Sequence, residues 1–70
     1  MVWFDKNDLL KSVGYLQPYT AYIVQYSLTQ VEFKVFNTND VLLLQGKCGS
    51  VAFAKELCES FMKGLKNASI

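Results

Sequence analysis

From residue 19 onward, apolar and polar positions follow a period of two. Residues 19–26 are rich in aromatic and β-branched side chains, which predicts a first strand. In residues 31–36 every odd position, beginning with Val31, is apolar and is expected to face one side, as in a half-buried antiparallel strand. Residues 41–44 are all apolar and are predicted to form a third strand.

Two helices are predicted around these strands. Residues 5–13 begin with Asp5, a good N-cap, and end before Gly14, a residue that commonly terminates helices. Residues 50–66 begin with Ser50 and carry apolar side chains at steps of three and four. The expected fold is therefore α+β, in the order α-β-β-β-α, with a three-stranded antiparallel sheet and two helices packed on one face.

Composition supports a folded domain. Of 70 residues, 51% are apolar and 14% are aromatic, which is too many for a disordered chain. This apolar excess fits either a dense small core or a core together with a surface that a partner covers. The length allows one domain, residues 1–70, which we expect to belong to a longer protein.

The charge balance does not favour a nucleic-acid partner. The formal net charge is +1 and the sequence pI is about 7.7, whereas nucleic-acid-binding domains typically have a pI above about 9 with clustered Lys and Arg. Here the basic residues are scattered along the chain.

The sequence offers little for catalysis. The chain has no His, which is the commonest general base, and its carboxylates are dispersed over predicted caps, turns and helix surfaces. Cys48 and Cys58 without His cannot make a zinc site. We expect no enzyme activity, no catalytic or metal-binding residues and no cofactor. With no signal peptide visible, a cytoplasmic or nuclear location with free thiols is expected, and Cys58 is expected to be a small core residue.

Residues 45–55, Gln-Gly-Lys-Cys-Gly-Ser-Val-Ala-Phe-Ala-Lys, resemble the corner between the third strand and the second helix of a double-stranded-RNA-binding domain. In that family, lysines at the helix start and a loop with Pro and His contact RNA. Here Val51 and Ala52 occupy the lysine positions, and the loop at residues 27–30 has neither Pro nor His. The pattern looks most like the third, non-RNA-binding domain of Dicer-partner proteins such as TRBP, PACT and Loquacious.

That resemblance implies a protein-interaction and homodimerisation module of the RNA-silencing machinery, with a Dicer-type ribonuclease as a further partner. The uncharged run at residues 41–44 supports a dimer independently, because natural edge strands are normally protected by Lys or Pro. The alternative is that the whole run is core. The expected dimer interface comprises Val41, Leu42, Leu43, Leu44 and Cys48. The expected partner-binding residues are Ile23, Phe36, Val51 and Lys55.

Two other functions fit the sequence. A weak double-stranded-RNA binder would need Lys11, Lys47 and Lys55 to converge on one face. A small phage or bacterial inhibitor protein would act by surface binding. In addition, Trp3, Tyr15 and Tyr19 either form an aromatic docking surface or seal the end of the core.

Overall fold

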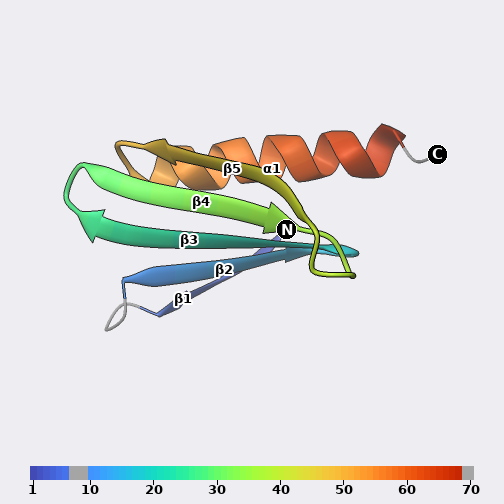
Figure 1. Cartoon of the computed structure of the whole chain (residues 1–70), viewed down its shortest axis with the longest axis horizontal. Coiled ribbons are helices and arrows are strands. Elements are labelled where there is room, and N and C mark those ends of the chain that lie inside the picture. The colour runs from blue at the N-terminus through green and yellow to red at the C-terminus, as the bar shows by residue number, and fades with distance from the viewer. Residues whose placement is uncertain (7–9, 69–70) are drawn as a thin grey trace.

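The computed structural model describes residues 1–6 and 10–68, which form five strands followed by one helix (Figure 1). The elements are β1 (Val2–Lys6), β2 (Lys11–Leu16), β3 (Tyr19–Ser27), β4 (Gln30–Phe36), β5 (Leu42–Cys48) and α1 (Val51–Ala68). All neighbouring strands pair antiparallel, and the sheet order is the chain order, β1-β2-β3-β4-β5. The sheet is therefore a meander whose two edges are β1 and β5.

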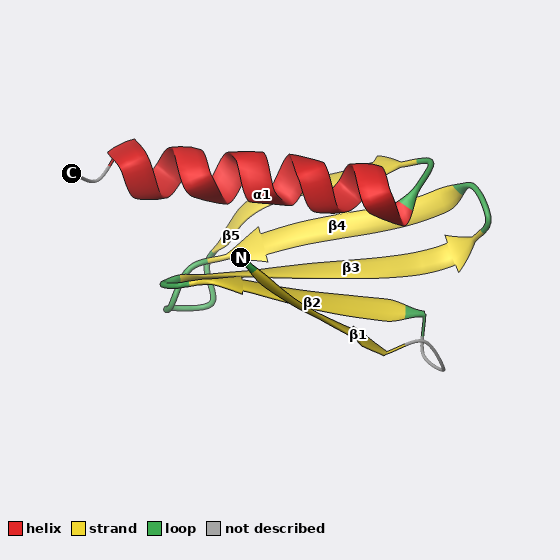
Figure 2. Cartoon of the chain, turned by 180° about the vertical axis from the view of Figure 1, so that it is seen from behind, coloured by secondary structure: helices red, strands yellow, loops and turns green. Residues whose placement is uncertain are grey.

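Helix α1 covers one face of the sheet and leaves the other face open. Viewed from behind, the helix lies over the β4–β5 side, and β1 lies at the opposite edge (Figure 2). The core is formed between the helix and the middle strands. Its buried members are Ala21, Ile23, Val31, Phe33, Val35, Ala54, Cys58 and Met62.

The α-β-β-β-α prediction is wrong, because the chain has the order β-β-β-β-β-α. The first predicted helix, residues 5–13, spans the end of β1 and the start of β2 instead. Residues 7–9 of that prediction lie outside the described residues. Short apolar segments fit either a helix or a strand, and here pairing with β3 determines the outcome.

Gly14 has a packing role and does not end a helix. It lies within β2 opposite Trp3 of β1, and a Cβ at this position would come within 2.6 Å of the Trp3 ring. The absence of a side chain lets the indole lie flat over the strand, toward the helix. Trp3 thereby packs against the core.

The third strand extends further than predicted, because Gly46, in the segment that resembles the strand-to-helix corner, lies inside β5. Gly46 pairs with Phe33, and a Cβ here would approach the Phe33 ring to 2.5 Å. The strand predicted at residues 41–44 therefore continues to Cys48, and the chain turns at Gly49 and Ser50.

Substituting Gly46 by Val is expected to lower the free energy of unfolding by about 1–3 kcal/mol, because the added atoms would overlap the buried Phe33 ring. Gly64 gives a matched control, since it lies in α1 and a Cβ added there would meet no atom within 4 Å. Gly64→Ala should raise the free energy of unfolding by about 1 kcal/mol through helix propensity. Urea denaturation of both variants tests this, and equal effects would contradict the packing role of Gly46.

Three other predicted elements are confirmed in position. Strands β3 and β4 match the period-two segments, with Val31, Phe33 and Val35 buried. Helix α1 begins where Ser50 accepts a hydrogen bond from the Phe53 amide at 3.1 Å, which is an N-cap contact. It extends to Ala68, two residues past the predicted end.

Candidate interaction surfaces

The strand register arranges the open face of the sheet in three rows that run across the strands. Residues paired across strands project to the same face, so each row follows directly from the register. The first row is Lys6, Lys11, Val24, Glu32 and Lys47. The second is Phe4, Val13, Tyr22, Lys34 and Gln45. The third is Val2, Tyr15, Thr20, Phe36 and Leu42.

Aromatic rings gather on this open face. Phe4 and Tyr15 form an edge-to-face pair with ring centroids 5.8 Å apart, and Tyr22 and Phe36 form a second pair at 5.6 Å. Tyr26 lies on the same face beyond the first row and is 62% exposed. Phe4, Tyr15, Tyr22 and Tyr26 are exposed and Phe36 is half-buried, so this group of rings is available to another molecule.

Charge is distributed unevenly over the molecule. On the described part of the open face, four lysines accompany a single carboxylate, that of Glu32, whose Oε1 lies 3.8 Å from Lys34 Nζ. The other described carboxylates, Asp5, Asp40, Glu56 and Glu59, lie elsewhere. The open face is therefore cationic although the net charge of the chain is only +1.

A second candidate surface follows the free edge of β5. We define the β5 edge surface as Val41, Leu42, Leu43, Phe53 and Leu57, all of which are exposed. The strand register shifts between Val35 and Phe36, so that Leu42 pairs with Phe36 and Leu44 pairs with Val35. Leu43 is thus the extra residue of a bulge. Leu44, by contrast, packs against the core.

The helix turns one apolar flank toward this edge. Successive residues are about 100° apart around a helix, so Phe53 and Leu57 lie on the side opposite Lys55 and Glu59. The Glu59 carboxylate accepts a hydrogen bond from Trp3 Nε1 at 2.7 Å, which shows that its flank faces β1. Since β1 and β5 are opposite edges of the sheet, Phe53 and Leu57 face the β5 side.

The β1 flank of the helix is held by a polar network. Lys55 Nζ lies 3.0 Å from the Asp5 carboxylate and 5.4 Å from the centre of the Trp3 ring. The Ser12 hydroxyl donates to the same carboxylate at 2.6 Å. The hydrogen bond from Ser12, followed by the one from Lys55, lowers the pKa of Asp5 below its ordinary value. These contacts tie the helix to the first hairpin.

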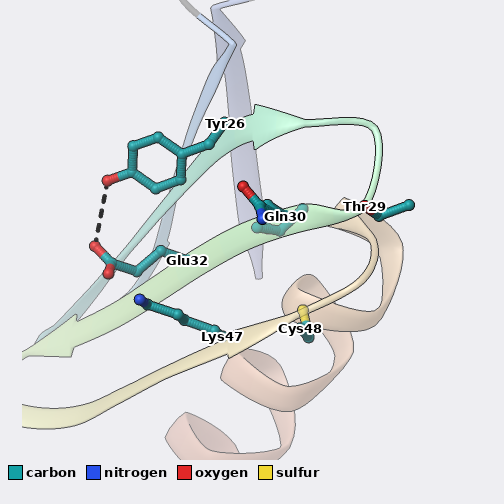
Figure 3. A pocket seen from close by; sticks show the side chains of 7 residues that line it. Tyr26, Thr29, Gln30, Glu32, Lys47 and Cys48 are labelled. Carbon is teal, nitrogen blue, oxygen red and sulfur yellow. Dashed lines mark hydrogen bonds between the residues drawn. The ribbon is translucent and has the colours of Figure 1, made fainter.

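A pocket of about 580 Å³ opens at the end of the β3–β4 hairpin. It is lined by Tyr26, Thr29, Gln30, Val31, Glu32, Lys47 and Cys48. Figure 3 shows the Tyr26 ring, the Glu32 carboxylate and the Lys47 side chain along one side of it, with the Tyr26 hydroxyl 3.5 Å from Glu32. The pocket adjoins the first row of the open face, to which Glu32 and Lys47 belong.

The structure separates the residues predicted for partner binding. Ile23 is buried beneath the helix, so its prediction as an accessible contact is wrong. Phe36 lies on the open face. Val51 packs against the core, and Lys55 is engaged with Asp5 on the helix side.

The residues predicted for RNA contact do not converge. Lys11 and Lys47 lie on the open face, whereas Lys55 lies on the opposite side of the sheet. Of the three aromatic residues considered near the N-terminus, Trp3 and Tyr19 pack against the core and Tyr15 lies on the open face. The sequence does not reveal the open aromatic face as a whole, because its local pattern predicts a helix for the N-terminal segment.

Within the predicted dimer interface, Val41, Leu42 and Leu43 are exposed, while Leu44 and Cys48 are partly buried. Both cysteines are free thiols. Cys58 is fully buried, as expected of a small core residue. Burial, and secondarily the nearby Cys48, raises the pKa of the Cys58 thiol to about 11.

Comparisons with family models, with curated proteins and with solved structures find no match. The double-stranded-RNA-binding resemblance depends on an α-β-β-β-α order that the chain does not have. The comparisons do not test the predicted Dicer-type partner. In the described part of the chain, no helix is both long enough and apolar enough to cross a membrane.

Proposed function

We propose that this chain is a protein-interaction module that associates with a second copy of itself through the β5 edge surface. The observation that carries the proposal is an edge strand whose first half is uncharged, beside an exposed apolar helix flank. Val41 is 52% exposed and Phe53 is 50% exposed, and no charged residue lies between Val41 and Gln45.

The edge of β5 is suited to pairing with another strand. Natural proteins usually protect an edge with Lys, Pro or a covering segment, because its unpaired N–H and C=O groups otherwise recruit a further strand. At the other edge, β1 ends in Asp5 and Lys6, both charged. In β5 the charged residue is Lys47, near the strand's end. In the first half of β5 the bulge at Leu43 is the protective feature, and no charged side chain accompanies it.

A second copy fits this edge by symmetry. A twofold axis perpendicular to the sheet would pair two β5 strands antiparallel and continue the sheet from one copy into the next. Both helices would then lie on the same face, with Phe53 and Leu57 of each copy directed toward the axis. The apolar flank would be covered in the same step as the strand edge.

Charge does not oppose this arrangement. With the axis near Leu44, each Lys47 lies three residues away, or about 10 Å at 3.3 Å per residue. The two lysines would stand about 20 Å apart on opposite sides of the axis, a separation at which ordinary salt screens their repulsion. The residues next to the axis are uncharged.

Light scattering coupled to size exclusion tests the proposal. The unmodified chain is expected to be a dimer at tens of micromolar, and Leu43→Lys and Phe53→Lys are each expected to give a folded monomer. Leu28→Lys is the matched control, because Leu28 is 90% exposed on the β3–β4 turn, at the opposite end of β4 from Leu42. It should remain dimeric.

Circular dichroism of each variant separates loss of the dimer from loss of the fold. An unmodified chain that is monomeric at several hundred micromolar would refute the proposal. A Leu28→Lys variant as monomeric as Leu43→Lys would also refute it, because the effect would then not depend on the β5 edge.

A further inference from the structure

From the open face of the sheet we infer a second function, the binding of single-stranded nucleic acid. This surface faces away from the helix and shares Leu42 with the β5 edge surface. Three of its four lysines stand in the first row, Lys34 stands beside the rings of the second row, and the pocket beside Tyr26 adjoins one end of the first row.

The lysines are placed to follow a phosphate backbone. Lys6 and Lys11 lie at one side of the first row and Lys47 lies at the other, across a sheet about 19 Å wide at 4.8 Å per strand spacing. Lys6, Lys11 and Lys47 form no ion pair with any described residue. Unpaired lysines on one face provide the electrostatic term that dominates nucleic-acid affinity.

The neighbouring rows supply rings for base stacking. Phe4 and Tyr22 stand in the second row, and Tyr15 and Phe36 stand in the third. Proteins that bind single strands without sequence preference combine a cationic track with exposed aromatic side chains on which bases stack. A strand lying across the sheet could place its phosphates on the first row and its bases on the other two.

The pocket can accept one base at the end of this track. Tyr26 offers a ring, the Gln30 side-chain amide can donate to and accept from a base edge, and Lys47 can contact the adjoining phosphate. The volume of about 580 Å³ lies in the range of small-molecule sites. Glu32 also lines the pocket, where its carboxylate is close to the Tyr26 hydroxyl and to Lys34.

The charge and the exposed rings of the open face favour single-stranded nucleic acid over a second copy, a duplex or an acidic peptide. Two copies packed face to face would bring eight lysines together against two glutamates, so self-association through this face is disfavoured. A duplex keeps its bases stacked inside and offers the rings nothing to stack on. An acidic peptide would satisfy the lysines but would leave the aromatic rows without a matching partner.

Fluorescence anisotropy with a labelled 20-nucleotide oligo-dT at low salt tests the inference. We expect saturable binding that weakens linearly in log salt. Lys11→Gln/Lys47→Gln should weaken binding at least tenfold and make the salt slope shallower by about 1.4, because each phosphate contact contributes about 0.7 for single strands. Lys63→Gln/Lys66→Gln removes the same charge from the helix and should change affinity less than twofold.

Stacking is tested separately. Tyr22→Leu keeps an apolar side chain but removes the ring, and it should weaken binding about 5- to 100-fold while leaving the salt slope unchanged. Circular dichroism confirms that each variant is folded. A flat titration to 100 μM, equal losses in the two double-lysine variants, or equal affinity for a 20-base-pair duplex would each overturn the inference. Displacement of the oligonucleotide by polyglutamate of matched charge would overturn it in favour of an acidic protein partner.

The two proposals can fail independently. Continuing the sheet through β5 would place the open faces of both copies on the same side. A dimer would therefore present two first rows of lysines on one surface. The monomeric Leu43→Lys variant should still bind oligo-dT, with weaker affinity. Binding without dimerisation, or dimerisation without binding, would therefore identify which surface is wrongly assigned.

Discussion

Replacing Met62 by Ala is expected to lower the free energy of unfolding by about 2–5 kcal/mol. Met62 is fully buried and shares one face of α1 with Ala54 and Cys58. The shortened side chain would leave a cavity between the helix and the sheet. A domain of this length has a total stability of about 4–10 kcal/mol, so the change could remove half of it or more.

Urea denaturation followed by fluorescence measures this loss directly. Trp3, the only tryptophan, packs against the core, so its emission reports unfolding. Met62→Leu is the control, because it nearly conserves volume and should cost less than about 1.5 kcal/mol. All samples must be compared at one protein concentration, since a dimer would make stability depend on concentration. A loss below about 1 kcal/mol for Met62→Ala would mean that the helix does not seal the core at this position.

The second large effect is expected at high pH, through Cys58. Its thiol pKa is raised from an ordinary value of 9.0 to about 11 in the folded state. Between these values the unfolded chain loses the proton while the folded chain keeps it, so the unfolded state binds fewer protons. Stability therefore falls as pH rises. The contribution of the protonated Cys58 thiol to the free energy of unfolding is complete below pH 9. It is lost as the pH rises through 11, and amounts to about 2–3 kcal/mol in total.

Comparison with Cys58→Ala isolates that contribution. All other ionisable groups are common to both proteins, so the difference between the two pH profiles belongs to Cys58. A thiol reagent at neutral pH should modify Cys48, which is partly exposed, well before Cys58. Parallel pH profiles for the two proteins would contradict the role assigned to the buried thiol.

The middle and the end of the chain could be predicted from local pattern alone. Val31, Phe33 and Val35 alternate with polar residues, and this alternation admits only a strand with one buried face. The three- and four-residue steps through Val51, Ala54 and Cys58 likewise require a helix that packs on one side. In these segments the local preference and the tertiary packing agree.

The first sixteen residues could not be predicted in this way. Asp5 and Gly14 are good helix-terminal residues, yet they serve here as an ion-pair partner of Lys55 and as the space for the Trp3 ring. Both roles depend on residues about 10 to 50 positions away in the chain. No local rule distinguishes a glycine that ends a helix from one that lets an indole lie over a strand.

The sequence predicts one part of the β5 edge surface and does not predict the other. The uncharged run at residues 41–44 is visible in the sequence as an edge that could pair, and the position of β5 at the edge of the sheet agrees with that interpretation. The helix flank of Phe53 and Leu57 beside that edge is not visible there. Its direction is known only because Glu59 and Lys55 contact β1.

The sequence by itself determined that this is one small folded domain with no histidine chemistry, two central strands, a C-terminal helix and an apolar third strand without protective charge. Tertiary structure alone decided that the N-terminal segment extends the sheet to five strands and that lysines and aromatic rings share its open face. The physical reason is that composition sums charge over the whole chain. Strand register, which depends on contacts between distant residues, decides on which face each charge stands.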